Sequence, residues 1–382
     1  MNATSAQVPS GPDQLSNAWL TAALRGAGAI GESAVSSHSW KAVERPGAAG
    51  SVVRITLDYE GNPGAAAPQT IIAKFASPYE PLRALLHSHG VYRTEVEFYR
   101  NFGSNAGIPV PRCYFADLDA SSGYFVLLLE DMRDCRVGDP LQAPLEDIEL
   151  AIDYLAPFHA HWWDSPRLRE FAWMRHPDVV PIEALAEQMR GQLARSLDAV
   201  RQRFPSEFPP VLVAIVERLL ANYDAVLERQ RDASRYTLVH RDFHPQQLFY
   251  PTERGGRFVV FDWQTATAGR GADDLARILT MGLTIPQREQ HERRLIERYH
   301  AGVARSGVAE YTLDQCVLDF RAGLTTSVLT NMVAATAIDP ELFKRAQSEF
   351  GINLADALFR PLAAAVETHD VLSLLPGQPK ST

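Results

Sequence analysis

Residues 236–279 are the stretch that most constrains what this chain can fold into, because two of its aspartates each follow an apolar run. A short apolar run, Leu238 and Val239, precedes Asp242, and a second run, residues 258–261, precedes Asp262. The turn-rich segment between the runs predicts a loop, then a hairpin, then a carboxylate at the hairpin exit. Two carboxylates twenty positions apart can therefore converge on one point.

Phosphoryl transfer uses such a pair of carboxylates. One orients the attacking hydroxyl, and the other holds the Mg²⁺ that bridges and neutralises the phosphates of ATP. The Walker pattern is absent, which disfavours a P-loop kinase. Only about ten residues separate Asp262 from a helix expected near Asp273, too few for the segment with which a protein kinase orders its peptide substrate. The pattern therefore predicts a kinase that uses ATP and Mg²⁺ and phosphorylates a small-molecule hydroxyl.

The letters HRD at residues 240–242, then Gln247, DWQ at residues 262–264 and the segment 269–276 carry a family resemblance. Together they resemble the catalytic core of the aminoglycoside phosphotransferase and choline kinase-like superfamily, and the ecdysteroid kinase-like and hydroxyacyl phosphotransferase branches are the most similar. The resemblance implies a two-lobe, protein-kinase-like α+β fold with a small β-rich N-terminal lobe and a large helical C-terminal lobe. It also implies a nucleotide-binding lobe at residues 1–131 and a catalytic, acceptor-binding lobe at residues 132–382.

The resemblance implies a role for each motif residue. Asp242 would be the catalytic residue that orients the acceptor hydroxyl, and Gln247 and Asp262 would be the metal ligands. The family usually has Gly where this chain has Arg241 and Asn where it has Gln247. The first departure is expected to be harmless, because protein kinases carry Arg there. The second puts the amide oxygen on a longer arm, which motivates a pseudokinase or nucleotide-binding scaffold as an alternative.

Lys74 is expected to contact the α- and β-phosphates of the nucleotide. It closes the apolar residues 71–73 of a β-rich run at 70–75, a position where a buried ammonium is costly unless an anion meets it. In the helix that follows, Glu95 flanks the inward face, whereas Glu97 lies on a charged face. The pattern predicts a Lys74–Glu95 ion pair; the alternative is a strand-end lysine that reaches solvent.

The remaining nucleotide contacts are predicted from position. A turn of small residues, PGAAGS at 46–51, lies just before a second β-rich run at 52–59, and such a turn can cover phosphates with backbone N–H groups, although most turns of this kind only connect strands. Its candidate residues are Gly47, Gly50 and Ser51. A buried-strand run at 124–129 leads into the segment that the resemblance identifies as the adenine-binding hinge, namely Glu130, Asp131 and Met132.

The C-terminal part is predicted to be helical. The helical pattern starts at residue 144 and its first apolar stripe runs through His159. Further expected helices are residues 181–204, 209–229, 273–281, 286–304, 313–336 and 340–375, after one short helix at 15–24. His159 and His161 point in different directions on a helix, so a hydrogen-bonded core His159 is favoured over a metal site. His240 is expected to bond within its loop and hold Asp242. Asp274 could cap its helix or bond the loop backbone, and capping is favoured.

Composition narrows the possible partners. The net charge of −9 argues against non-specific nucleic-acid binding. Three widely spaced cysteines suit a reducing compartment, and the chain shows neither a signal peptide at its start nor a membrane-spanning apolar run. A cytoplasmic enzyme without membrane or nucleic-acid partners is expected.

Two further alternatives concern the chemistry and the acceptor. HRDFH at residues 240–244 could ligate a metal in a hydrolase, but Pro245 argues against the regular strand that this requires. An aminoglycoside acceptor calls for an acid-lined pocket, and residues 321–338 contain no acidic residue. If this stretch lines the acceptor site, the acceptor is a largely apolar alcohol, a macrolide-like compound or a hydroxyacyl thioester; the alternative is a plain core helix.

Overall fold

The computed structural model describes residues 8–43, 50–139, 142–174, 182–224, 235–253, 255–337 and 340–376. The chain forms two units. Unit 1 comprises Met1–Arg136 and Phe249–Ala266, and unit 2 comprises Val137–Leu248 and Thr267–Thr382. The expected boundary followed residue 131, and the main difference is the segment Phe249–Ala266, which lies with unit 1. The chain therefore returns to unit 1 directly after the HRD loop, and Asp262 belongs to that unit.

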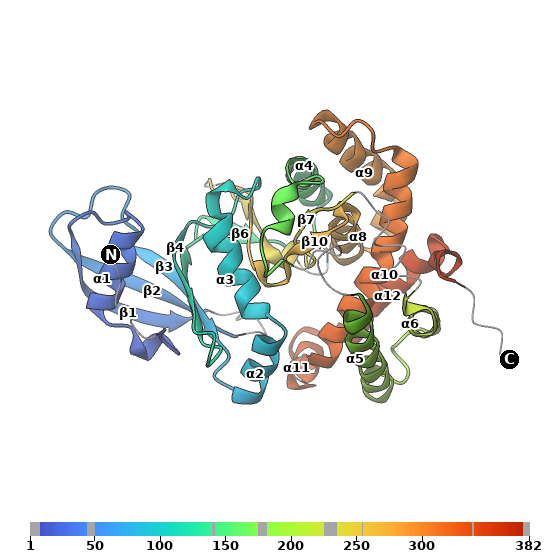
Figure 1. Ribbon diagram of the computed structural model, residues 1–382, viewed down its shortest axis with the longest axis horizontal. Coiled ribbons are helices and arrows are strands. Elements are labelled where there is room, and N and C mark those ends of the chain that lie inside the picture. The colour runs from blue at the N-terminus through green and yellow to red at the C-terminus, as the bar shows by residue number, and fades with distance from the viewer. Residues whose placement is uncertain are drawn as a thin grey trace. The chain divides into compact units, whose positions relative to one another are not determined.

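Unit 1 is built on a five-stranded antiparallel sheet in the order β1-β2-β3-β5-β4 (Figure 1). Its strands are β1 Ala34–Ala42, β2 Gly50–Glu60, β3 Thr70–Ala76, β4 Cys113–Leu118 and β5 Phe125–Glu130. β5 is buried on both faces, which explains its continuous apolar sequence. The predicted runs at 52–59, 70–75 and 124–129 correspond to β2, β3 and β5.

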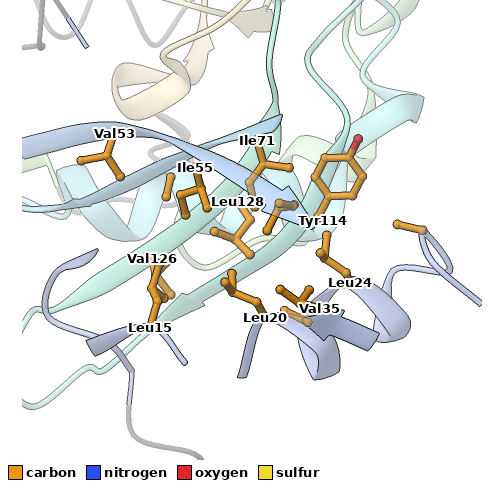
Figure 2. Packing of buried hydrophobic residues seen from close by; sticks show 14 of the residues in the cluster. Leu15, Leu20, Leu24, Val35, Val53, Ile55, Ile71, Tyr114, Val126 and Leu128 are labelled. Carbon is orange, nitrogen blue, oxygen red and sulfur yellow. The ribbon is translucent and has the colours of Figure 1, made fainter. Parts of the chain in front are cut away.

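Helices cover both faces of this sheet. Leu20 and Leu24 of α1 (Asn17–Gly26) pack with Val126 and Leu128 in one buried cluster (Figure 2). On the other face lie α2 (Glu80–Ser88) and α3 (Val91–Asn101), where the Tyr92 ring is 4.7 Å from that of Phe125. Side chains alternate along a strand. In β3 the side chains of Ala73 and Phe75 therefore join the α1 cluster, and the intervening Lys74 faces α3.

A second, three-stranded sheet leads to Asp262. Its order is β6-β8-β9, with β6 Cys135–Val137, β8 Leu248–Pro251 and β9 Val259–Val260. The short helix η5 (Trp263–Thr265) follows, and the Trp263 ring stacks on Phe98 of α3 at 4.0 Å between centroids and 6° between planes. This stack of two buried rings fixes the segment after the hairpin against α3.

The described part of unit 2 is mainly helical and contains a two-stranded antiparallel sheet of β7 (Thr237–Val239) and β10 (Thr267–Gly269). Its helices are α4 Leu145–His161, α5 Ile182–Arg203, α6 Pro210–Ala221, α8 Gly271–Gly282, α9 Ile285–Arg305, α10 Leu313–Ala337, α11 Pro340–Phe350 and α12 Leu354–Thr368. α8 packs against α4, α9, α10 and α12. At Gly323 of α10 a Cβ would lie 2.9 Å from the Ala272 carbonyl oxygen, so glycine permits this close approach of α10 to α8.

Short 3₁₀ helices complete the described chain: η1 Pro12–Gln14, η2 Gly103–Asn105, η3 Pro166–Arg169, η4 Pro245–Gln247 and η6 Val371–Leu374. The predicted α+β fold, with a β-rich N-terminal part and a helical C-terminal part, is confirmed. One predicted helix, residues 340–375, is wrong as a single element, because Gly351 takes a positive φ of 66° between α11 and α12. Across the residues described, no helix is long and apolar enough to cross a membrane.

Candidate active site

In unit 1, Lys74 lies between two carboxylates. Its Nζ is 2.7 Å from Glu95 Oε2 and 2.6 Å from Asp262 Oδ1. The predicted Lys74–Glu95 pair is thus present, and Asp262 joins it. Burial by itself lowers the pKa of Lys74, but Asp262 and Glu95 outweigh burial and raise it, so Lys74 is charged at all ordinary pH values. One ammonium faces two carboxylates, and burial raises the pKa of Glu95 to about 7 although Lys74 opposes that shift.

The backbone of Asp262 is strained. Its φ of 64° and ψ of 58° lie in the left-handed region, which costs a residue other than glycine about 1–3 kcal/mol and is frequent at functional sites. Two contacts hold the neighbouring segment: the Trp263–Phe98 stack and the bond from Trp263 Nε1 to the Val260 carbonyl at 3.1 Å. The packing of η5 therefore fixes the direction in which the Asp262 carboxylate points.

The donor set around Asp262 fits a hard divalent cation. Gln264 Nε2 donates to Asp262 Oδ2 at 3.2 Å, while the buried Oε1 of Gln264 has no hydrogen-bond partner in the described part of the chain. The carboxylate oxygens of Asp262 and the amide oxygen of Gln264 suit Mg²⁺, which is usually bound by one or two carboxylates plus substrate phosphates. No group of three or more His, Cys, Asp or Glu side chains is placed to hold a metal among the described residues.

Of the predicted phosphate-covering residues, Gly47 lies outside the described residues. Gly50 and Ser51 begin β2, where they pair with Ala76 and Phe75 of β3. A Cβ at Gly50 would lie 2.1 Å from the Phe75 carbonyl oxygen, so strand pairing alone requires glycine here. Their role toward a nucleotide stays a prediction.

The predicted hinge begins at Glu130, the last residue of β5, and ion pairs anchor it. The Glu130 side chain accepts from Arg257 Nη2 at 2.6 Å and Nη1 at 3.1 Å, and Asp131 accepts from Arg54 Nε at 2.7 Å. The Glu130 N–H donates to the Arg112 carbonyl at 2.8 Å, so this N–H is engaged. Adenine contacts, if made by Glu130, Asp131 or Met132, would therefore use the other backbone groups of the segment.

In unit 2, the HRD loop leaves β7 and is held by its own first residue. His240 is fully buried, and its Nδ1 accepts from the Asp242 backbone N–H at 3.2 Å. The predicted structural role of His240 within the loop agrees with this bond.

The prediction that Asp274 caps its helix is wrong. The N-cap of α8 is Arg270, whereas Asp274 points inward with no exposed area. Its Oδ2 accepts from the His240 N–H and its Oδ1 from the Arg241 N–H, both at 2.7 Å. Asp274 therefore anchors the HRD loop. Burial explains the difference: a carboxylate on the inner face of α8 cannot reach the solvent-facing N–H groups of the first turn.

His159 of α4 supports the same anchor. Its Nε2 lies 3.3 Å from Asp274 Oδ2 and its Nδ1 lies 2.8 Å from the Tyr299 hydroxyl. The predicted core role of His159, as opposed to a metal-binding role, agrees with these contacts and with its complete burial.

Arg241 also adopts a left-handed backbone, with φ of 70°. Glycine takes this conformation freely, which gives a physical reason for the Gly that the resembling family usually carries. From the sequence alone, this departure is expected to be harmless. The structure shows instead that Arg241 has a backbone cost at this position. The ion pair from Arg241 Nη1 to Asp273 Oδ2 at 2.8 Å opposes that cost.

The Asp242 carboxylate is held on both oxygens. Oδ1 accepts from Arg277 Nη2 at 2.8 Å and Nε at 3.1 Å, and His244 Nε2 lies 3.4 Å away. Oδ2 accepts from Gln247 Nε2 at 3.3 Å. Burial raises the pKa of Asp242, but His244 and Arg277 outweigh it and hold the pKa well below its ordinary value. Asp242 is therefore ionised at neutral pH.

The comparison with protein families identifies the chain's relatives. Residues 65–311, more than half of the chain, match the phosphotransferase enzyme family, APH. The chain belongs to this family. The match contains Lys74, Glu95, Asp242, Gln247 and Asp262. A search of curated proteins finds no match.

Solved structures of small-molecule kinases are similar to this phosphotransferase. The choline kinase of Cryptosporidium parvum is 11% identical, with a TM-score of 0.49 over 88% of this chain and 92% of that one. The ethanolamine kinase of Plasmodium vivax is 10% identical, with a TM-score of 0.48 over 89% and 85%. An aminoglycoside phosphotransferase of Streptomyces rimosus is 17% identical, with a TM-score of 0.42 over 82% and 97%.

Two capacities follow from the residues of this phosphotransferase. Unit 1 offers an ammonium with carboxylates, which suits phosphate and cation binding, and unit 2 offers an oriented, ionised carboxylate that can accept a bond from a hydroxyl. Sequence reasoning missed Arg277. Its signal is a charged residue inside the otherwise apolar LARIL segment of α8, where a buried arginine needs an anionic partner.

Proposed function

We propose that this phosphotransferase moves the γ-phosphate of ATP, with Mg²⁺, to a hydroxyl of a small molecule that is not a polycation. The acceptor classes that fit are a largely apolar alcohol, a macrolide-like compound and a hydroxyacyl thioester. The observation that carries the proposal is the Lys74, Glu95 and Asp262 cluster, in which the Lys74 ammonium lies 2.6–2.7 Å from two carboxylates, a set of groups that suits a metal–nucleotide complex.

Each residue then has one task. Lys74, held by Glu95, would bind the α- and β-phosphates, and Asp262 and Gln247 would hold Mg²⁺, which supplies charge neutralisation to the phosphates. Asp242 would accept the hydrogen bond of the acceptor hydroxyl and so aim its oxygen at phosphorus. The low pKa of Asp242 makes it a weak base, so it serves mainly to orient the hydroxyl. We propose that both groups of residues serve this one reaction.

The charges of unit 2 favour an acceptor without ammonium groups, since each buried ammonium would need a carboxylate partner. Among the described residues, four carboxylates of the HRD loop, α8 and α10 already have partners. They are Asp242 with Arg277, Asp273 with Arg241, Asp274 with two backbone N–H groups, and Asp319 with Arg270. Arg277 also donates to Asn331 of α10, so this helix, with its small hydroxyl and apolar side chains, lies one side chain away from Asp242. This supports α10 as a lining of the acceptor site.

The test measures ADP release from Mg-ATP over a panel of apolar alcohols, macrolides, hydroxyacyl thioesters and aminoglycosides. We expect release above the rate with water for a neutral or anionic alcohol, and loss of that release in folded Asp242→Asn and Asp262→Ala variants. Stimulation by aminoglycosides alone would refute the acceptor class. A wild-type protein that binds nucleotide but never turns it over would favour the scaffold alternative, and unchanged turnover in Asp262→Ala would refute the metal role.

A further inference from the structure

We propose that Arg277 is a positioning residue: its guanidinium fixes the orientation of the Asp242 carboxylate so that Oδ2 is presented to the acceptor hydroxyl. The proposal rests on the proposed function, because it assigns Arg277 a part in orienting that hydroxyl. It goes beyond the motif residues, since Arg277 lies on α8, outside the HRD loop.

The guanidinium reaches one oxygen of Asp242 with two donors. Nη2 and Nε of Arg277 donate to Oδ1 at 2.8 and 3.1 Å, and the Arg277 side chain is only 6% exposed. Two N–H groups of a rigid planar fork that meet one acceptor fix both its distance and its direction. The carboxylate of Asp242 therefore has little freedom to turn about its side-chain torsions.

Asn331 keeps the guanidinium itself in place. The third nitrogen, Nη1 of Arg277, donates to Asn331 Oδ1, and Asn331 Nδ2 donates to the Leu358 carbonyl of α12 at 2.6 Å. Asn331 is 1% exposed. Arg277 is thus bracketed between α10 and the loop, which links the packing of α8, α10 and α12 to the catalytic carboxylate.

The arrangement divides the two oxygens of Asp242 by function. Oδ1 is occupied by the two donors of Arg277, with His244 at 3.4 Å. Oδ2 accepts only the longer bond from Gln247, 3.3 Å, among the contacts described. A carboxylate oxygen accepts two hydrogen bonds, so Oδ2 retains the capacity to accept from a hydroxyl. Misplacement by about 1 Å can cost about 100-fold in rate, which sets the size of the expected effect.

Arg288 is a matched control for a purely structural role. It is 1% exposed, it lies in the same unit on α9, and its Nη1 pairs with Glu292 Oε2 at 2.7 Å. It thus resembles Arg277 in burial and in pairing with a carboxylate, but its partners belong to α9 and α12. Loss of either arginine removes a buried ion pair, and only loss of Arg277 releases Asp242.

The experiment compares Arg277→Ala, Arg277→Lys, Asn331→Ala and Arg288→Ala with wild type. ADP release from Mg-ATP is measured with water as acceptor and with the best alcohol of the panel, and the Kd of a fluorescent ATP analogue and the Tm are measured beside it. We expect kcat of Arg277→Ala to fall about 100-fold with the nucleotide Kd within about twofold, partial rescue by millimolar guanidinium chloride, and none by NaCl. Arg277→Lys should retain more activity than Arg277→Ala. Asn331→Ala should lose less activity than Arg277→Ala, because it leaves the guanidinium present.

Arg288→Ala should lower Tm without a comparable loss of kcat in the folded protein and without rescue by guanidinium. Full turnover in folded Arg277→Ala or Arg277→Lys would overturn the proposal. A loss that guanidinium does not restore, and that Arg288→Ala reproduces, would overturn it too, in favour of a structural role. If wild type itself turns over no ATP with any acceptor, the proposed function fails and this inference falls with it.

Discussion

Replacing Arg241 by glycine or alanine separates backbone strain from ion pairing. Both substitutions remove the pair with Asp273, whose side chain is 11% exposed, and leave a carboxylate whose pKa is already raised by burial. With Arg241 itself 34% exposed, we expect this loss to cost about 2 kcal/mol, below the range for a fully buried pair. Only glycine relieves the φ of 70°, which costs other residues about 1–2 kcal/mol.

Glycine also adds about 0.5–1 kcal/mol of unfolded-chain entropy, which offsets part of the relief. We therefore expect Arg241→Gly to be more stable than Arg241→Ala by about 0.5–1 kcal/mol, with both below wild type. Urea denaturation followed by far-UV circular dichroism measures the difference. In an Asp273→Asn background the pair is already weakened, so Arg241→Gly should there lie close to or above its parent. An alanine variant as stable as the glycine variant would refute the strain argument.

Three further predictions follow from other contacts. Gly50→Ala should destabilise unit 1 by about 2 kcal/mol or more, because its Cβ would lie 2.1 Å from the Phe75 carbonyl oxygen, whereas Gly26→Ala, with open space around it, should be neutral or stabilising in the same thermal melt. Gln247→Asn should leave kcat unchanged or lower it, because the shorter side chain loses its bond to Asp242 Oδ2; a several-fold gain in kcat would contradict the view that the loop is fitted to the longer glutamine side chain. Burial raises the pKa of Glu292, but His369 and Arg288 outweigh it and lower the pKa below 4.5. The pairs of Glu292 with His369 and Arg288 therefore add stability above pH 4.5, and this stability is lost as pH falls. In urea denaturation series between about pH 3 and 6, the free energy of unfolding of Glu292→Gln should depend less on pH than that of wild type. The same pH dependence in both proteins would contradict this prediction.

Sequence reasoning located the parts of the site that depend on local patterns. The pairing of Lys74 with Glu95 follows from the sequence because a lysine that closes an apolar run needs an anion and Glu95 flanks the inward face of the next helix, and the structure has them 2.7 Å apart. The hairpin before Asp262 followed from two apolar runs around a turn. β1 was not predicted, because its sequence, AVSSHSWKA, has one buried residue and no apolar run. Edge strands of this kind are specified by pairing with a neighbour more than by their own pattern.

Asp274 and Arg277 show where local patterns are insufficient. An acidic residue in the first turn of a helix is typically a cap or a partner of the helix dipole, and that statistical preference favoured the wrong role for Asp274. Its inward direction is set by the rotation of α8 within its helical surroundings. The same rotation brings Arg277, three positions later on the same face, to Asp242. A single sequence does not give this rotation, because it depends on which helices cover α8.

Backbone strain at Asp262 and beside Asp242 has a common physical cause. Arg241, just before Asp242, and Asp262 itself are both left-handed, although neither is glycine. Such conformations persist only where surrounding contacts over-determine them: at Arg241 the Asp274 carboxylate binds the N–H and Asp273 binds the guanidinium, and at Asp262 the Trp263–Phe98 stack fixes the next residue. A left-handed residue reverses the chain within one position, so it can aim a side chain away from the preceding strand while the strand stays paired. The carboxylates are thereby oriented before any substrate binds, and the stability lost to strain is offset by contacts that lie outside the reacting groups.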